Sequence, residues 1–242
     1  MALGQKTRER MKFLKYIASV RPAINAIFLG AVVSIIVMEG WLNSIPEVVS
    51  WGSKFGEVYF KICLSIISSY VFYFIVVHIK TVQDKENIGQ FVSGKVRNVI
   101  GNYKSQIGEL KKAANNSSKE VFLEKKDIEA IFLSINPQGQ APLLIGGPGN
   151  YAKWLQYMDY HKSRTQGSIQ KVFVKIPFLD SKLVALLAKI DDCTHFMVID
   201  HSANRRVSNT DMSAWASSFY DYGLLCKELE NYYEKHLVHY LR

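Results

Sequence analysis

Cysteine is scarce in this 242-residue chain, which contains only Cys63, Cys193 and Cys226. An odd number of cysteines without metal-like spacing fits neither a disulfide framework nor a cysteine-based zinc site. His236 and His239 lie three residues apart near the end of the chain and lack further candidate ligands. We therefore expect reduced thiols in the cytosol, no metal and no cofactor.

Catalytic motifs are also missing. The sequence has no nucleophile elbow, no Walker A motif and no dinucleotide-binding fingerprint. Asp200, His201 and Ser202 are consecutive, so they cannot normally converge as a triad. Cys193 and His195 could form a thiol and base pair on one face of a strand, although a buried structural cysteine is more common. We predict that the protein is not an enzyme, and a membrane-tethered hydrolase using Cys193 or His201 is the weakest alternative.

Charge is absent from two long apolar runs, residues 22–38 and 62–79. Each run approaches the length of about 20 residues that is needed to cross a bilayer core of about 30 Å. The first run is longer than the apolar core of a typical signal peptide, and no small-residue cleavage pattern precedes Glu39. Residues 1–79 therefore predict a basic flank followed by a retained two-helix transmembrane hairpin.

The distribution of charge predicts how this hairpin is oriented. Residues 1–22 contain six Lys or Arg and one Glu, whereas residues 39–61 contain two Lys and three Glu. Because basic flanks stay in the cytoplasm, we expect a multi-pass protein of the bacterial inner membrane with both termini cytoplasmic. The net charge of +9 includes no dense basic stripe after residue 80. Polymeric nucleic acid is therefore not an expected partner, whereas the lipid bilayer is.

The rest of the chain predicts a helical connector, residues 80–114, and a cytosolic ligand-sensing domain, residues 115–242. Apolar residues recur in the connector at spacings of three and four, which is typical of a helix that packs either within the chain or on further copies of it. They are Ile88, Val92, Val96, Val99, Tyr103, Ile107 and Leu110.

The sensing domain is predicted to be a small α/β layer rich in helix, because apolar strand-like segments alternate with helical ones. Ser117 and Glu120 match a capping box that opens a helix ending before Pro137. We expect strands at 143–145, 169–176 and 195–200, and further helices at 150–163, 180–190 and 211–241.

A glycine-rich segment is the first candidate ligand site. Gly146 and Gly147 follow a predicted strand, and Asn150 opens a predicted helix that carries Lys153 one turn in. Glycines let the backbone approach an anion, and the free amides at a helix start attract it. The alternative is a plain turn.

A polar segment after the last predicted strand is the second candidate site. It contains His201, Asn204, Arg205 and Arg206. Ligands gather at the carboxyl ends of strands in α/β sheets, and paired arginines bind phosphate by bidentate hydrogen bonds. Solvated loop charges are the alternative. If both loops face one cleft, together they form an anion site.

The layout of a basic N-terminus, a two-span hairpin and a cytosolic basic domain resembles small bacterial defence effectors. The apolar segment from Ser68 to Val77 is similar to the second span of such proteins. Among them, the chain most resembles the membrane effector of type III CRISPR systems that binds cyclic tetra-adenylate. The resemblance implies a homotetramer whose soluble domains bind the cyclic oligonucleotide and whose spans perturb the membrane. The resemblance assigns no ligand-binding residue to any position of this chain, because no binding motif is shared.

The leading hypothesis is therefore a homo-oligomeric membrane effector of bacterial antiviral defence that senses a cyclic oligonucleotide second messenger. The alternative is a two-span pore-forming or SLATT-like membrane module that is controlled by a partner protein.

Overall fold

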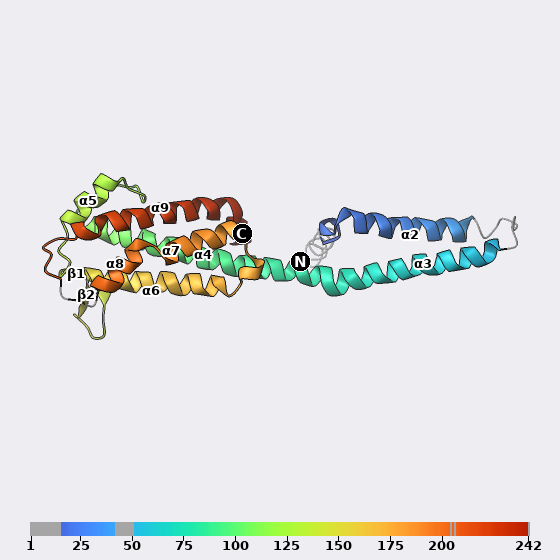
Figure 1. Ribbon diagram of the computed structural model, residues 1–242, viewed down its shortest axis with the longest axis horizontal. Coiled ribbons are helices and arrows are strands. Elements are labelled where there is room, and N and C mark those ends of the chain that lie inside the picture. Colours follow the sequence, from blue (N-terminus) through green and yellow to red (C-terminus); the bar gives the residue numbers. More distant parts are fainter. Residues whose placement is uncertain (1–15, 42–50, 204, 206, 242) are drawn as a thin grey trace, which may run out of the picture. The chain divides into compact units, whose positions relative to one another are not determined.

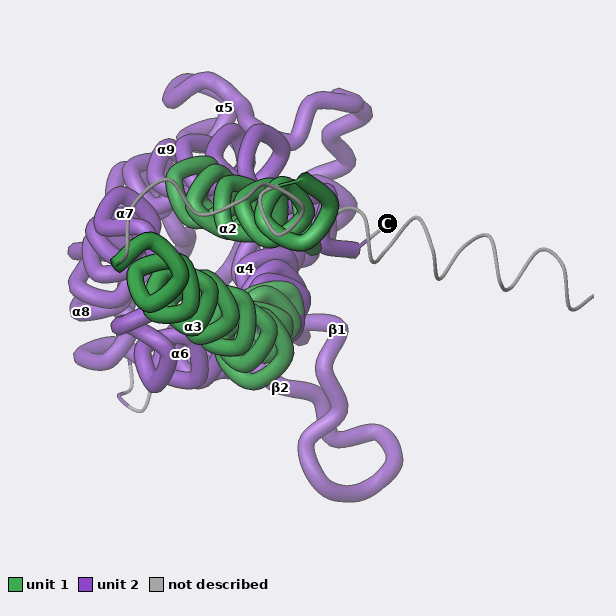
Figure 2. Tube along the Cα trace, turned by 90° about the vertical axis from the view of Figure 1, so that its right-hand side faces the viewer, with its two compact units in different colours: residues 1–86 green, residues 87–242 purple. Residues whose placement is uncertain are grey.

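The computed structural model describes residues 16–41, 51–203, 205 and 207–241, which are mostly helical with one small sheet (Figure 1). The chain divides into two compact units, residues 1–86 and 87–242 (Figure 2). The division falls within helix α4 (Ile79–Ala113), which covers most of the predicted connector 80–114. The described residues are mostly helical with one two-stranded sheet, which is compatible with the predicted helix-rich α/β fold.

The first unit contains a helical hairpin. Helix α2 (Pro22–Gly40) packs against helix α3 (Gly52–Phe72), which continues through a short π-helix, η2 (Tyr73–His78), into α4. Pro22 stands at the start of α2, where its missing N–H breaks no helical bond. Both α2 and the continuous segment Gly52–Ala113 are long and apolar enough to span a membrane.

Polar side chains of this hairpin pair with one another. The Tyr70 hydroxyl donates to Asn25 Oδ1 at 2.7 Å, and the Tyr70 ring stacks on Phe28 at 4.1 Å between centroids. His78 Nε2 lies 2.9 Å from the Ser19 hydroxyl. Such pairing is required where no water reaches the backbone or the side chains.

The second unit is a helical assembly around one core. Helices α4, α6 (Trp154–Phe173) and α9 (Ser213–His236) run side by side in Figure 1, and α5 (Lys125–Leu133), α7 (Ser181–Asp191) and α8 (Thr194–Ser202) pack against α9. The apolar stripe of α4 is buried in this core except for Ile88, which is half-buried against it. Of the two alternatives for this stripe, packing within the chain is therefore the one that is observed.

An aromatic cluster fills the centre of this core. The Tyr103 ring lies 5.4 Å from Phe122, 5.5 Å from Phe219 and 5.5 Å from Tyr222 between centroids. Gly223 of α9 faces this cluster: a Cβ atom at that position would lie 2.6 Å from the Tyr103 hydroxyl oxygen. The close approach of α9 to Tyr103 therefore requires glycine.

Replacing Gly223 with alanine is expected to destabilise the second unit by about 1–3 kcal/mol, because the buried Tyr103 ring cannot move aside. The matched control is Gly101→Ala in α4, where an added Cβ meets no atom within 4 Å. That substitution should stabilise the helix by up to about 1 kcal/mol. Urea unfolding of both variants measures the difference, and equal midpoints would contradict this account.

Two predicted strands are helices instead. Residues 169–176 form the end of α6 and the start of η3 (Ile176–Phe178), and residues 195–200 lie within α8. The buried residues of α8 are His195, Phe196 and Ile199, a helical rather than an alternating spacing. The predicted capping box is also wrong, because α5 begins only at Lys125.

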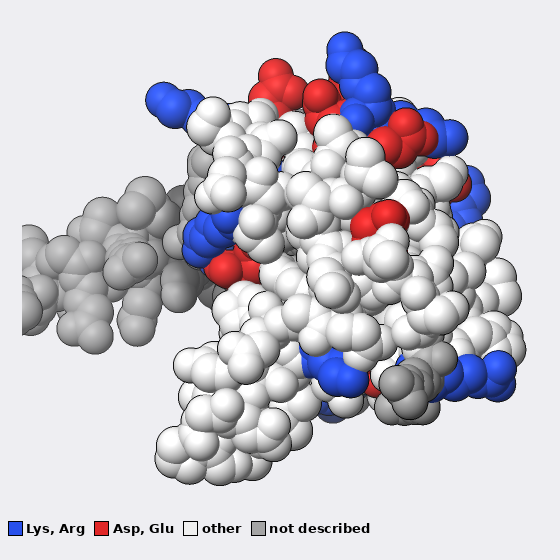
Figure 3. All heavy atoms as spheres, turned by 90° about the vertical axis from the view of Figure 1, so that its left-hand side faces the viewer, with Lys and Arg blue, Asp and Glu red and all other residues white. Residues whose placement is uncertain are grey.

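The sheet is an antiparallel hairpin of β1 (Gln140–Leu144) and β2 (Tyr151–Lys153). The helix predicted from residue 150 begins at Trp154, because β2 precedes it. Residues 138–152 contain no charged side chain, and the hairpin projects uncharged from the face seen in Figure 3. The helix predicted at 180–190 is confirmed as α7, and that at 211–241 as α9 followed by a 3₁₀ turn, η4 (Val238–Leu241).

Candidate ligand-binding groove

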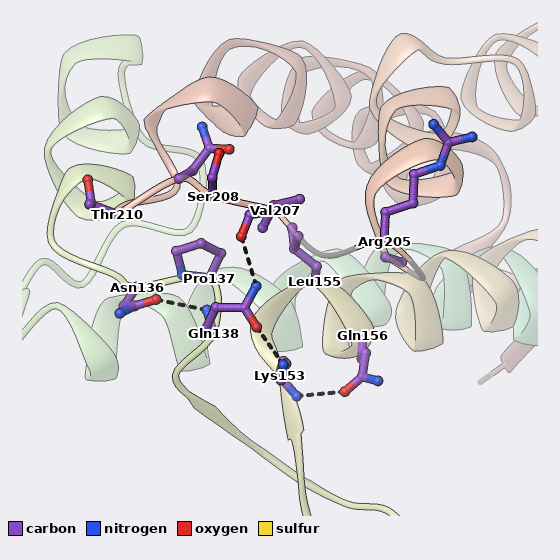
Figure 4. A pocket seen from close by; sticks show the side chains of 12 residues that line it. Asn136, Pro137, Gln138, Lys153, Leu155, Gln156, Arg205, Val207, Ser208 and Thr210 are labelled. Carbon is purple, nitrogen blue, oxygen red and sulfur yellow. Dashed lines mark hydrogen bonds between the residues drawn. The ribbon is translucent and has the colours of Figure 1, made fainter.

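An open polar groove of about 950 Å³ lies in the second unit, where three segments meet (Figure 4). The segments are the turn after α5, the junction of β2 and α6, and the loop between α8 and α9. The residues that line the groove are Asn136, Pro137, Gln138, Lys153, Leu155, Gln156, Ala203, Arg205, Val207, Ser208, Asn209 and Thr210.

Gln138 connects the three segments. Its backbone N–H donates to Asn136 Oδ1 at 2.9 Å, which closes the turn after α5. Its side-chain amide donates to the carbonyl oxygen of Val207 at 3.4 Å and accepts a hydrogen bond from Lys153 Nζ. Figure 4 shows these bonds as one row across the groove. The floor of the groove is therefore held by side-chain contacts between segments far apart in the sequence.

The junction of β2 and α6 positions Lys153 at the end of this row. Lys153 directly precedes the first residue of α6, and its backbone N–H donates to Gln156 Oε1 at 2.9 Å. This contact is the reverse half of a capping box, which fixes the direction in which the chain enters the helix.

The loop between α8 and α9 is anchored at both ends. Near its start, Asp200 pairs with the buried Lys162 of α6, which also pairs with Asp159 at 2.8 Å. Burial opposes the charged form of Lys162, but hydrogen bonds to the two carboxylates outweigh it and raise the pKa of the ammonium group. At the other end of the loop, the backbone N–H of Met212 donates to the carbonyl oxygen of Phe132 at 3.0 Å.

The described lining of the groove carries positive charge only. Lys153 and Arg205 contribute cations, and no described lining residue is an Asp or Glu. Arg205 is exposed, and Figure 4 shows its side chain pointing away from the hydrogen-bonded row. Amides and hydroxyls make up most of the remaining polar surface. A groove with this lining favours an anionic ligand that also offers neutral hydrogen-bonding groups.

Of the sequence-predicted site residues, Lys153 and Arg205 therefore line one groove. Gly146, Gly147 and Asn150 do not line it, since they form the tip of the β1–β2 hairpin. There Gly146 has a φ of 77°, and the Asn150 side chain donates to the carbonyl oxygen of Ile145 at 2.8 Å. These glycines lie between two strands and do not precede a helix. This described segment therefore lacks the predicted strand–loop–helix geometry of an anion site.

His201 lies exposed in the last turn of α8 and does not line the groove. The segment that contains it follows a helix rather than the predicted strand. Asn204 and Arg206 lie outside the described residues.

The neutral polar residues of the groove are not among the residues that the sequence predicts for a ligand site. The turn Asn136–Pro137–Gln138 carries a recognisable signal, because Asn followed by Pro favours a turn that exposes polar side chains. Ser208, Asn209 and Thr210 have the composition of any loop, so their place beside Lys153 could not be foreseen.

The thiol and base considered for catalysis lie away from this groove. Burial raises the pKa of Cys193 to about 11, which keeps its thiol protonated near neutral pH. His195 is buried beside Phe219 and Tyr222, and its Nδ1 lies 3.3 Å from the Ser218 hydroxyl. Both have the surroundings of structural core residues.

Comparison with known proteins gives no further assignment. No protein-family model, curated protein or solved structure matches this chain. Within the described residues, no group of three His, Cys, Asp or Glu side chains could hold a metal ion.

Proposed function

We propose that this chain is a membrane effector of bacterial antiviral defence. Its second unit binds a cyclic oligonucleotide, such as cyclic tetra-adenylate, in the polar groove, and its oligomeric transmembrane helices then perturb the inner membrane. The observation that carries the proposal is a groove with two cations and no described carboxylate, in a chain that also has two helices suited to a membrane. No catalytic step is part of this function.

The outward-facing side chains of the first unit support insertion into lipid. Ile27, Ile36, Ile62, Phe72 and Ile75 are each more than half exposed on the helical hairpin. Full burial of an exposed Ile or Phe side chain contributes about 1.5–3 kcal/mol, and leaving these side chains partly exposed to water loses a share of that free energy. A hydrocarbon environment removes this penalty, and the basic N-terminal flank then favours cytoplasmic termini and a multi-pass inner-membrane location.

The chemistry of the groove supports a nucleotide of more than one residue. Lys153 and Arg205 would bind phosphate groups, since charge-assisted hydrogen bonds are the strong ones. The amides of Asn136, Gln138 and Asn209 offer donors and acceptors for base edges. Sites for small molecules enclose about 300–1,000 Å³, and this groove lies at the upper end of that range.

Assembly into a homotetramer is part of the proposal. Ser65, Ser68 and Ser69 are exposed and recur on one side of α3, within the apolar segment. Small polar residues allow helices to approach closely in a bilayer and to form hydrogen bonds across the contact. A ligand with rotational symmetry would match a symmetric assembly, and it would shift the membrane helices only if two states of the assembly bind it with different affinity.

The decisive experiment is calorimetric titration of the full chain in nanodiscs with a panel of cyclic di-, tri- and tetranucleotides. We expect at least one to bind, and we expect Lys153→Gln to weaken its binding about tenfold or more, because a charge-assisted hydrogen bond is lost. Arg205→Gln should act in the same direction.

The matched control is Lys126→Gln, which removes an exposed lysine of α5 that does not line the groove. This variant should bind as the unchanged chain does. Absence of binding across the panel, or equal affinity of the Lys153 and Lys126 variants, would contradict the proposed site.

One observation favours the alternative of control by a partner protein. Residues 138–152, which make up the β1–β2 hairpin up to Lys153, carry no charge and expose Leu144, Ile145 and Tyr151. Exposed apolar side chains grouped on a projecting hairpin are typical of a protein-binding surface. If no nucleotide binds, a stoichiometric protein recovered with the chain from native membranes, and lost on substitution of Leu144 and Ile145 by serine, would support a two-span pore-forming or SLATT-like module.

A further inference from the structure

The junction between α6 and α7 exposes three large apolar side chains within five residues. Val174 is 75% exposed, Ile176 46% and Phe178 68%, whereas Val172 just before them is fully buried. We refer to Val174, Ile176 and Phe178 as the apolar ridge. Because the second unit has an extensive core of its own, the exposure of this ridge is not explained by the packing of that unit.

The ridge is held in a defined shape. The backbone N–H of Lys175 donates to the Val172 carbonyl oxygen at 2.8 Å, and that of Phe178 donates to the Lys175 carbonyl oxygen at 2.9 Å. Pro177 lies between the last two ridge residues and restricts the backbone further. The apolar side chains are therefore presented outward by a hydrogen-bonded turn.

Lysines flank the apolar ridge. Lys171 and Lys182 are exposed and Lys175 is half-buried. The nearby carboxylate of Asp180 accepts hydrogen bonds from the Tyr232 hydroxyl at 2.9 Å and from the backbone N–H of Lys182 at 3.3 Å. Apolar side chains surrounded by cations are the pattern that binds the interface of an anionic bilayer.

Contacts within the second unit place the apolar ridge at the end where α4 enters that unit. Asp180, two residues after the ridge, bonds to Tyr232 of α9. The chain after α9 then returns to α4, where the Ser93 hydroxyl donates to the Leu237 carbonyl oxygen at 3.0 Å and Gly89 lies against the Tyr240 ring. Figure 1 shows the α6–α7 junction and the last turn of α9 at the same end of this unit.

The start of α4 connects this end to the candidate spans. Gly89 follows the last residue of the apolar run, Ile79, by ten residues, which corresponds to about 15 Å along a helix. If the apolar segment spans a membrane, only about ten residues of chain separate it from the end of the second unit that carries the apolar ridge, a length that allows the ridge to contact the lipid surface. The inference rests on this membrane-spanning part of the proposed function.

We propose that the second unit docks on the anionic lipid surface through the apolar ridge. Phe178, Ile176 and Val174 enter the boundary between headgroups and acyl chains, and the flanking lysines contact anionic headgroups. A second copy of the chain fits this surface less well, because like-charged lysines would face each other and three side chains fall far short of the roughly 1,200–2,000 Å² of a stable protein interface.

The test uses the full chain with Phe178→Cys, labelled with an environment-sensitive fluorophore, in nanodiscs that hold one chain each. In discs containing anionic phosphatidylglycerol, we expect a blue shift and strong quenching by nitroxide-labelled lipids. Discs of phosphatidylcholine alone should give at least twofold weaker quenching. The matched control is Leu133→Cys, an equally exposed apolar position in α5, which should show no quenching in either disc.

The outcomes separate this inference from the proposed function. If the chain resists extraction from membranes by alkaline carbonate but position 178 is not quenched, the docking inference is wrong and the membrane-spanning assignment stands. If alkaline carbonate extracts the chain from membranes, the membrane-spanning assignment is wrong, and the docking inference that rests on it is wrong as well. A blue shift that appears only when two or more chains share a disc would show that a second copy covers the ridge, and would also overturn the inference.

Discussion

Replacing Phe132 with alanine is expected to lower the free energy of unfolding of the second unit by about 3–5 kcal/mol, the usual cost of deleting a buried aromatic ring. Phe132 is fully buried at the contact between α5 and α9, and its ring lies 5.2 Å from that of Phe219. Urea unfolding of the full chain in detergent, followed by the near-ultraviolet circular dichroism of the aromatic cluster, measures the change.

The control lies one residue further along the same helix. Leu133 is 63% exposed, so Leu133→Ala should change the free energy of unfolding by less than about 0.5 kcal/mol. The Phe132 variant should also weaken ligand binding in the groove, because loss of the packed ring loosens the end of α5, whose backbone carbonyl oxygen at position 132 accepts the hydrogen bond from Met212. Similar unfolding midpoints for the two variants would contradict the observed packing of α5.

Acidification is expected to destabilise the second unit through His195. Complete burial lowers the pKa of this histidine to about 3, whereas an unfolded chain has a histidine pKa near 6.5. Between these values the unfolded state binds more protons, so the free energy of unfolding falls as the pH decreases below 6.5. At pH 5 the loss from this one group is about 2 kcal/mol. Burial lowers the pKa of His161 to about 4, which adds in the same direction.

Unfolding at pH 7.5 and pH 5.0 measures this effect. His195→Gln cannot take up a proton at this position, so the dependence of unfolding free energy on pH should become weaker even if the variant is less stable at both values. His201→Gln is the matched control, because His201 is exposed on the same helix. A His195 variant that retained the full pH dependence would show that other groups cause it.

The helical parts of the fold were predictable because their sequence periodicity is strong. The stripe from Val92 to Leu110 has the spacing of a buried helical face and is buried, and the segment 180–190 corresponds to α7. The strand predicted at 195–200 is wrong because a short apolar run fits a strand and a buried helix equally well. Only the surrounding helices decide between them.

Of the twelve described residues that line the candidate groove, the sequence predicts two, both of them cations. Lys153 is predicted from its charge and its place one turn into a helix after the glycine segment, Arg205 from its charge in the loop after the last predicted strand, and both line the groove. The glycine segment was misplaced because one short strand, Tyr151–Lys153, separates it from the helix. The contribution of Gln138 depends on tertiary contacts with Val207 and Lys153, and no local pattern encodes these contacts.

The two anchors of the loop between α8 and α9 have a consequence for ligand selectivity. The pair of Lys162 with Asp200 joins the start of the loop to α6, and the bond from Met212 to Phe132 joins its end to α5. Such preorganisation reduces the conformational entropy lost on binding. A loop held at both ends would also select ligands by geometry. Compounds would be distinguished by the distance between their anionic groups more than by their total charge.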